Sequence, residues 1–318
     1  MNVKIKESEI VESIITLSNV SKSYQLQQVV KNLSLIIPEG SLYGFLGPNG
    51  AGKTTTMRIL IGLIEADNGE IFLKGKNIKE WNKSLFNHVG CFIDTPSYYP
   101  NLTAYENLAY IQKITNKPLS EVNRVLKITG IFHVKDKKVK NFSMGMKQRL
   151  GLAFAMLNDP DILILDEPTN GLDPEGIHEI RNFLINLCKN EGKTIFVSSH
   201  NLAEIEMMAD YIALINQGEL IYDGKLDDIL ISKEYIVKVK QTEEVIQMLT
   251  SRGLEITRLR DGKISFKTDQ NKIAFINKQM TEKNVDVYEL TPRKRTLEEM
   301  FLDLTKKDNP KKVVGLYE

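Results

Sequence analysis

At residues 47–54 the sequence reads Gly47-Pro48-Asn49-Gly50-Ala51-Gly52-Lys53-Thr54, which matches the pattern Gly-x-x-x-x-Gly-Lys-Ser/Thr at every position. A short apolar run, Leu42–Leu46, precedes this stretch, and we expect a helix over Thr54–Leu63 after it. Glycines let successive backbone N–H groups turn inward, and the positive end of the helix points at the same spot. Lys53 can then reach the β- and γ-phosphates of a nucleotide, and the Thr54 hydroxyl can ligate Mg²⁺. A glycine-rich turn that matches by chance is the alternative, which the flanking strand and helix disfavour.

A second informative stretch is an apolar run, Ile162–Leu165, that ends in Asp166, Glu167 and Pro168. At the carboxyl end of a buried parallel strand, charged groups are expected to serve a ligand. We assign Asp166 to the Mg²⁺ shell. We assign Glu167 to polarising the attacking water, a step typically worth on the order of 10²–10⁴ in rate. Two solvated carboxylates after a strand are the ordinary alternative, which the phosphate-binding loop makes the weaker one.

The composition of the 318 residues sets the broad class. The hydrophobic share is 42% and the charged share 26%, ordinary values for a globular protein. Forty-two basic and 41 acidic side chains nearly cancel, so we expect no nucleic-acid partner. Cys91 and Cys188 have no paired spacing, which suits a reducing compartment. The longest apolar run is only strand-sized and the start resembles no signal peptide, so we expect a cytoplasmic protein that meets the membrane only through a partner.

Strand and helix patterns alternate through most of the first 224 residues. Besides Leu42–Leu46, the predicted strands are Ile14–Val20, Leu33–Ile37, Ile162–Leu165, Thr194–Ser198 and Tyr211–Ile215, the last followed by a hairpin turn at residues 215–219. Strands that alternate with helices predict an α/β fold with a largely parallel sheet covered by helices. Between about 96 and 160 the strand signals vanish. There Thr103 and Glu106 match a capping box, and Gly130 is a predicted helix stop.

A smaller α+β unit is predicted after residues 225–234, which read as a connection. Its predicted strands are Tyr235–Lys240, Leu254–Leu259, Ile264–Thr268 and Val285–Leu290, and its predicted helices are Glu243–Arg252 and Lys272–Glu282. The order β-α-β-β-α-β indicates a ferredoxin-like sandwich. Thr296 and Glu299 match a capping box that begins one more helix. We therefore divide the chain into an extension (1–13), a nucleotide-binding domain (14–234), a small C-terminal domain (235–305) and a charged tail (306–318).

One further motif carries a resemblance to a known family. Residues 142–149 read Phe-Ser-Met-Gly-Met-Lys-Gln-Arg and resemble the signature motif of ATP-binding-cassette (ABC) proteins, whose usual form is Leu-Ser-Gly-Gly-Gln. Ser143 and Gly145 match that form, the other three positions depart from it, and the usual Gln-Arg follows. The Ser143 hydroxyl and the backbone N–H groups of a helix start are good phosphate ligands. A plain Ser-Gly helix start is the alternative.

Further matches to the ABC family extend over residues 14–224. Tyr24 resembles the aromatic that stacks on adenine, with an ordinary strand aromatic as the alternative. Asp173 resembles a residue of the loop that crosses the dimer interface, and His200 resembles the switch histidine that contacts the γ-phosphate. The resemblance implies an ATP site made of Tyr24, residues 47–54 and Thr55, with Lys53, Glu167 and His200 as catalytic residues.

Asp94 is an informative departure, because the family normally carries at this position a glutamine that senses Mg²⁺ and the membrane partner. Members similar to bacitracin-export and lantibiotic-protection systems often carry glutamate there, and residues 99–104 and 145–150 resemble theirs. Aspartate is shorter than either, so we expect Asp94 to reach Mg²⁺ through a water molecule. A local replacement without bearing on the substrate is the alternative.

The resemblance also implies the architecture and the partners. It implies a P-loop NTPase (RecA-like) core with an antiparallel β subdomain and a helical subdomain at about 94–160. We expect an ATPase that uses ATP and Mg²⁺, forms a head-to-tail homodimer, and powers a separate membrane permease docked near Asp94–Tyr99. The expected place is the inner face of the cell membrane, and the expected task is export of a peptide antibiotic, lantibiotic or other amphiphile. A soluble ABC ATPase that acts as a regulatory or nucleic-acid-associated switch is the alternative.

Overall fold

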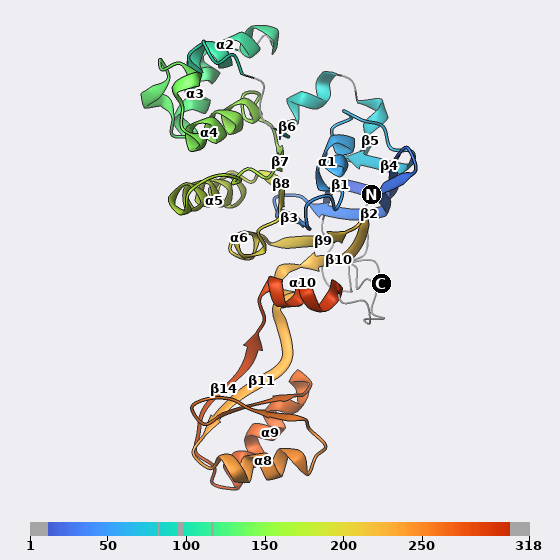
Figure 1. Ribbon diagram of the computed structural model, residues 1–318, viewed down its shortest axis with the longest axis vertical. Coiled ribbons are helices and arrows are strands. Elements are labelled where there is room, and N and C mark those ends of the chain that lie inside the picture. Colours follow the sequence, from blue (N-terminus) through green and yellow to red (C-terminus); the bar gives the residue numbers. More distant parts are fainter. Residues whose placement is uncertain (1–11, 82, 95–97, 116–117, 306–318) are drawn as a thin grey trace. The chain divides into compact units, whose positions relative to one another are not determined.

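The computed structural model describes residues 12–81, 83–94, 98–115 and 118–305 (Figure 1). The described chain forms two compact units. Among these residues, the first unit runs to Leu226 and also takes in 301–305, and the second comprises Asp227–Met300. The predicted tail, and all of the predicted N-terminal extension except residues 12 and 13, lie outside the described residues.

The central sheet of the first unit has the strand order β10-β9-β3-β8-β7-β6 (Figure 1). Its strands are β3 (Leu42–Leu46), β6 (Val89–Phe92), β7 (Ile162–Asp166), β8 (Thr194–Ser199), β9 (Tyr211–Asn216) and β10 (Glu219–Lys225). All neighbours run parallel except β9 and β10, which form the predicted hairpin. Gln217 and Gly218 have positive φ, as a tight hairpin turn with matching twist requires. The predicted parallel sheet is confirmed.

A second, antiparallel sheet packs on the first one. It has the order β2-β1-β4-β5, built from β1 (Ser13–Tyr24), β2 (Gln27–Pro38), β4 (Asn68–Leu73) and β5 (Lys76–Asn77). Buried side chains of both sheets and of helix α1 (Lys53–Leu60) share one apolar core, which includes Leu35, Phe45, Met57 and Phe196. This core fixes the loop between β3 and α1 against both sheets.

Helices fill the remaining parts of the first unit. They are α2 (Ala104–Thr115), α3 (Ser120–Ile128), α4 (Met144–Ala155), α5 (Pro174–Lys189) and α6 (Leu202–Glu206), with short 3₁₀ turns η2 (Ile78–Glu80), η3 (Lys83–Asn87), η4 (Phe132–Val134) and η5 (Val139–Asn141). Helix α7 (Leu226–Leu230) begins at the last residue before the second unit and otherwise belongs to that unit. The predicted capping box of α2 is present, because Thr103 and Glu106 exchange hydrogen bonds of 2.7 and 3.1 Å. Gly130 follows α3 with a positive φ, as a helix stop does.

The second unit has the predicted order of elements. Its strands are β11 (Ile231–Val239), β12 (Ile256–Arg258), β13 (Lys263–Lys267) and β14 (Val287–Lys294), and its helices are α8 (Thr242–Thr250) and α9 (Gln270–Glu282). The sheet order is β12-β13-β11-β14 and every neighbouring pair is antiparallel, as in a ferredoxin-like sandwich. Val237, Leu249, Phe266 and Met280 belong to its separate core.

Several predicted boundaries differ from the structure. The helix after the glycine-rich loop ends at Leu60, before Gly62 with its positive φ, and not at Leu63. Residues 225–234 are not a plain connection, because α7 and the first residues of β11 occupy them. Residues 232–234 are polar, so the sequence shows no strand pattern there. The strand forms nevertheless, because backbone pairing needs no apolar alternation. The break between the units accordingly falls at Asp227, earlier than residue 235, and the last helix, α10 (Leu297–Thr305), is divided at Met300.

Candidate active site

The glycine-rich loop leads from β3 directly into α1 and is pressed against neighbouring backbone. Gly52 precedes α1 with a φ of 106°, and a Cβ atom there would lie 2.6 Å from the carbonyl oxygen of Val29. A Cβ atom on Gly47 would lie 2.3 Å from the carbonyl oxygen of Ile215. Only glycine fits either position. The loop therefore holds its N–H groups at the amino end of α1, which favours an anion.

Lys53 lies across this loop and is nearly buried, with 6% of its surface exposed. Its Nζ donates to the carbonyl oxygens of Gly47 at 2.7 Å and of Pro48 at 3.3 Å. The same atom lies 3.3 Å from Glu167 Oε1. The loop carbonyls and one carboxylate therefore hold the ammonium group in place.

Two oxygen atoms suited to a hard cation meet at the amino end of α1. The Thr54 hydroxyl donates to Asp166 Oδ2 at 2.7 Å, and the Ser198 hydroxyl on β8 donates to the other Asp166 oxygen. Asp166 is the last residue of β7 and is nearly buried. Hydroxyl and carboxylate oxygens are the ligand types that Mg²⁺ prefers, so Thr54 and Asp166 fit the predicted role. Mg²⁺ sites usually complete their shell with water and phosphate oxygens.

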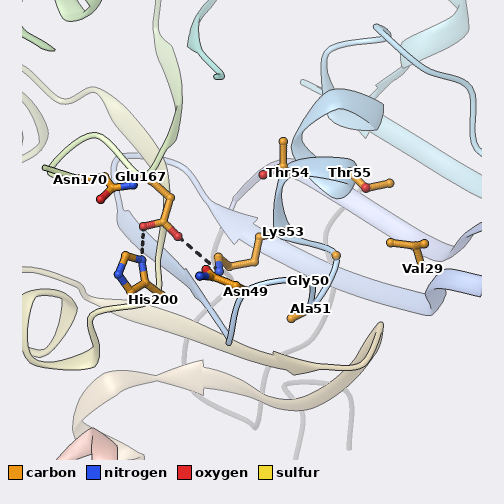
Figure 2. A pocket seen from close by; sticks show the side chains of 11 residues that line it. Val29, Asn49, Gly50, Ala51, Lys53, Thr54, Thr55, Glu167, Asn170 and His200 are labelled. Atoms are coloured by element: carbon orange, nitrogen blue, oxygen red, sulfur yellow. Dashed lines mark hydrogen bonds and ion pairs between the residues drawn. The ribbon is translucent and has the colours of Figure 1, made fainter. Parts of the chain in front are cut away.

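Glu167 follows Asp166 in the left-handed region of backbone space, with a φ of 50°. Its N–H donates to Ser198 Oγ at 3.0 Å, which turns the carboxylate back over the sheet edge. Glu167 Oε2 lies 2.6 Å from His200 Nδ1 (Figure 2). The imidazole can donate from Nδ1 to this carboxylate oxygen, which is a hydrogen-bond acceptor. The carboxylate thus bridges Lys53 and His200.

Lys53, Thr54, Glu167 and His200 share one cavity of about 380 Å³ (Figure 2). It is lined by residues 49–55, Glu167 and His200, which the sequence predicted, and by Val29 and Asn170, which it missed. Asn170 lies three residues after Glu167, and its polar side chain beside the acidic pair was the available signal. Val29 carries no such signal, because its position depends on how β2 passes the loop. Tyr24 lies at the exposed end of β1 and is not among the lining residues.

The signature residues lie elsewhere. Ser143, Gly145 and Asp173 line a different cavity, of about 440 Å³, that shares no lining residue with the first. Ser143 caps α4 by accepting a hydrogen bond from the Met146 N–H at 3.3 Å. Asp173 caps α5 by accepting one from the Gly176 N–H at 3.0 Å. The chain thus presents two separate surfaces built around helix starts.

Asp94 lies on the wall of a third cavity, of about 470 Å³, together with Asp166 and Glu167. Its carboxylate accepts a hydrogen bond from Arg58 Nη2 at 2.6 Å. This bond raises the pKa of Arg58 above its usual value. Asp94 is therefore held by α1, in the same cavity as the acidic pair.

A phosphate-binding loop facing two carboxylates at the ends of parallel strands defines a P-loop nucleoside triphosphatase. A family described as ABC transporter matches residues 30–170. The chain is 38% identical to the bacitracin transport ATP-binding protein BcrA of Bacillus licheniformis over 92% of its own length and 97% of that protein. It is 41% identical to the lantibiotic transport ATP-binding protein SrtF of Streptococcus pyogenes, over 67% and 92% of the two chains. The chain therefore belongs to the ABC transporter ATP-binding proteins, which makes it an ATPase.

A solved structure agrees with this assignment. A dimeric, post-hydrolysis ATP-binding cassette, MJ0796 bound to ADP and Pi, superposes with a TM-score of 0.61 and 26% identity, covering 67% of this chain and 98% of that one. The shared part is thus about the size of the first unit. None of the helices in the described part of the chain is both long and apolar enough to cross a bilayer.

Proposed function

We propose that this ATPase powers export of a peptide antibiotic, a lantibiotic or another amphiphile by a separate membrane permease, through ATP-driven closure of a dimer. Similarity to BcrA over 97% of that protein, second unit included, supports this substrate class more strongly than a match confined to the nucleotide-binding core. The proposed place of work is the cytoplasmic face of the cell membrane, reached through the permease.

The proposed dimer rests on one observation: the two sets of residues expected to contact one ATP molecule lie in separate places within a single chain. The glycine-rich loop and the signature residues line different cavities in one chain, with no lining residue in common. A triphosphate held by Lys53 therefore leaves Ser143 of the same chain unused. In a head-to-tail dimer each nucleotide contacts the glycine-rich loop of one subunit and Ser143 and Gly145 of the opposite subunit. Asp173 then lies in the loop that crosses the dimer interface. ATP then stabilises the closed dimer, and hydrolysis removes that stabilisation.

Within each site the residues have distinct proposed roles. Residues 47–55 cradle the phosphates, and Tyr24, exposed at the end of β1, supplies a face for adenine. Glu167 orients and polarises the attacking water, and His200 holds that carboxylate and contacts the γ-phosphate. Thr54 and Asp166 would hold Mg²⁺, which would supply positive charge beside the phosphates, and Asp94 would interact with it through water.

The proposed permease contact centres on the helical part of the first unit. An exposed cluster, here called the tyrosine patch, consists of Tyr99, Tyr110, Ile111 and Ile114. Tyr99 and Tyr110 pack edge to face with ring centroids 5.5 Å apart. Exposed aromatic and aliphatic side chains gathered on one surface are typical of a protein interface. Tyr99 of this patch is also the last residue of the predicted docking segment, Asp94–Tyr99.

The decisive experiment measures protection of living cells. The chain and its permease are expressed in a susceptible bacterium, and growth is followed against bacitracin and against a lantibiotic. We expect resistance to at least one of them with the wild-type chain, and none with Glu167→Gln at equal protein level. Resistance to neither compound, with ATP hydrolysis intact, contradicts export of bacitracin and of that lantibiotic.

A further inference from the structure

One side chain ties the signature helix to the turn that carries the catalytic carboxylate. Gln148, on α4, donates from Nε2 to the carbonyl oxygen of Asn170 at 3.1 Å. The backbone N–H of Asn170 donates to the carbonyl oxygen of Glu167, also at 3.1 Å, which closes the turn from Glu167 to Asn170. Gln148 therefore holds the far end of this turn.

The backbone of Glu167 depends on such support. Its φ of 50° lies in a region that residues with a side chain seldom occupy. A conformation of this kind persists only where surrounding contacts determine it. The bond from the Glu167 N–H to Ser198 Oγ determines one end of the turn, and the bond from Gln148 determines the other.

Packing joins the same two elements a second time. The Met144 Cε atom lies 3.4 Å from where a Cβ on Gly171 would be, and Leu172 Cδ2 lies 3.7 Å from where a Cβ on Gly145 would be. The first turn of α4 and residues 170–172 therefore form one continuous contact. A displacement at the start of α4 moves Asn170 with it, because close-packed groups transmit strain.

We infer that Gln148 is a positioning residue. When the signature motif binds a nucleotide, Gln148 transmits the resulting displacement of α4 to the carboxylate of Glu167 in the same subunit. The inference rests on the proposed function, because only in the proposed dimer does the signature motif meet the nucleotide of the partner subunit. It adds a defined route between the two ATP sites through one chain: from Ser143 along α4 to Gln148, then to Asn170 and Glu167.

The test compares two substitutions at this position in the full chain with its permease. Gln148→Met keeps the length and loses the donor, whereas Gln148→Lys keeps a donor. We expect Gln148→Met to lower kcat about five-fold, the effect of one neutral hydrogen bond, with an unchanged KM for ATP. Gln148→Lys should stay within about two-fold of wild type. Gln247→Met, an exposed helix position of the second unit, is the matched control.

A double-substitution cycle separates positioning from a merely structural role. In the Glu167→Gln background, Gln148→Met should not reduce the residual single-turnover rate further, because Gln148 acts through the carboxylate. An unchanged kcat in Gln148→Met, an equal loss in Gln148→Lys, or a full additional loss in the double variant each overturns the inference. A wild-type chain that hydrolyses no ATP with its permease contradicts the proposed function itself, and this inference falls with it.

Discussion

Glu167 Oε2 and His200 Nδ1 lie 2.6 Å apart, although 33 residues separate them in the chain. The contact forms because β7 and β8 pair in parallel, so that the residues after both strands emerge at the same edge of the sheet. Glu167 Oε1 faces Lys53 Nζ at 3.3 Å, which places the carboxylate between the His200 imidazole and the Lys53 ammonium group. This arrangement orients the carboxylate toward the space above the glycine-rich loop.

Replacing Glu167 by glutamine should separate binding from turnover. The amide keeps the shape of the side chain but cannot accept a proton or strongly polarise water. We expect ATP affinity to stay near the wild-type value while hydrolysis falls by roughly 10²–10⁴. Light scattering with Mg²⁺-ATP should show a persistent dimer. Wild-type-like phosphate release from this variant contradicts the assigned role.

Replacing His200 by alanine should leave Glu167 without its imidazole partner. The carboxylate then has more freedom to turn away from the attacking water. We expect kcat to fall by about 10² with little change in the KM for ATP, measured as steady-state phosphate release. His133→Ala, at an exposed histidine of η4, serves as the control and should match wild type. Equal rates for the two variants argue against a role for His200.

The sequence alone predicts the local parts of the site well. Glycines, a lysine and a threonine between a strand and a helix specify the phosphate loop, because each depends only on neighbours in the chain. The parallel sheet also follows from the alternation of short apolar runs with helices. Residue identity likewise indicated the carboxylate pair at the end of β7.

What sequence reasoning missed depends on packing between distant segments. Val29 joins the cavity of the glycine-rich loop only because β2 passes beside Gly52. The bond between Arg58 and Asp94 requires α1 to lie against the end of β6. The start of β11 was missed for another reason, since its polar residues carry no strand signal and its pairing with β14 and β13 defines it.

Replacing Lys53 by alanine should weaken nucleotide binding itself. A charge-assisted contact to phosphate is lost, and a loss of roughly ten- to a hundred-fold in ATP affinity is the expected scale. Equilibrium titration with a fluorescent ATP analogue measures it, with Lys140→Ala, an exposed lysine of η5, as the control. An affinity equal to that of the control excludes the cradle role of Lys53.

Replacing Ile114 by glutamate should break the permease contact without harming the ATP site. Ile114 is 66% exposed and belongs to the tyrosine patch, so a charge there disturbs little of the core. We expect the chain to stop co-purifying with the permease from detergent-solubilised membranes, while keeping its ATP affinity. Phe275→Glu, at a similarly exposed apolar residue of the second unit, should still co-purify. If Ile114→Glu still co-purifies with the permease, the tyrosine patch is not the docking surface.

Replacing Asp223 by asparagine should remove a pH dependence of folding. Tyr43 donates a hydrogen bond to Asp223 Oδ1, whereas Oδ2 is buried without a hydrogen-bond partner among the described residues. Burial raises the pKa of Asp223 from its usual 3.8 to about 7, against the opposing effect of Tyr43. The unfolded chain loses this proton near its usual value and the folded chain keeps it to about pH 7, so stability falls as the pH rises through this window.

A gap of roughly three pH units corresponds to about 4 kcal/mol, the upper scale of the effect. Urea unfolding at several pH values between about 4 and 8 should therefore show a free energy of unfolding that falls with rising pH for the wild type. The profile of Asp223→Asn should be flatter, and above the folded pKa the two profiles should have the same slope. Asp136→Asn, at an exposed loop position, should keep the wild-type slope. Parallel profiles for wild type and Asp223→Asn rule out a buried carboxyl with a raised pKa at this position.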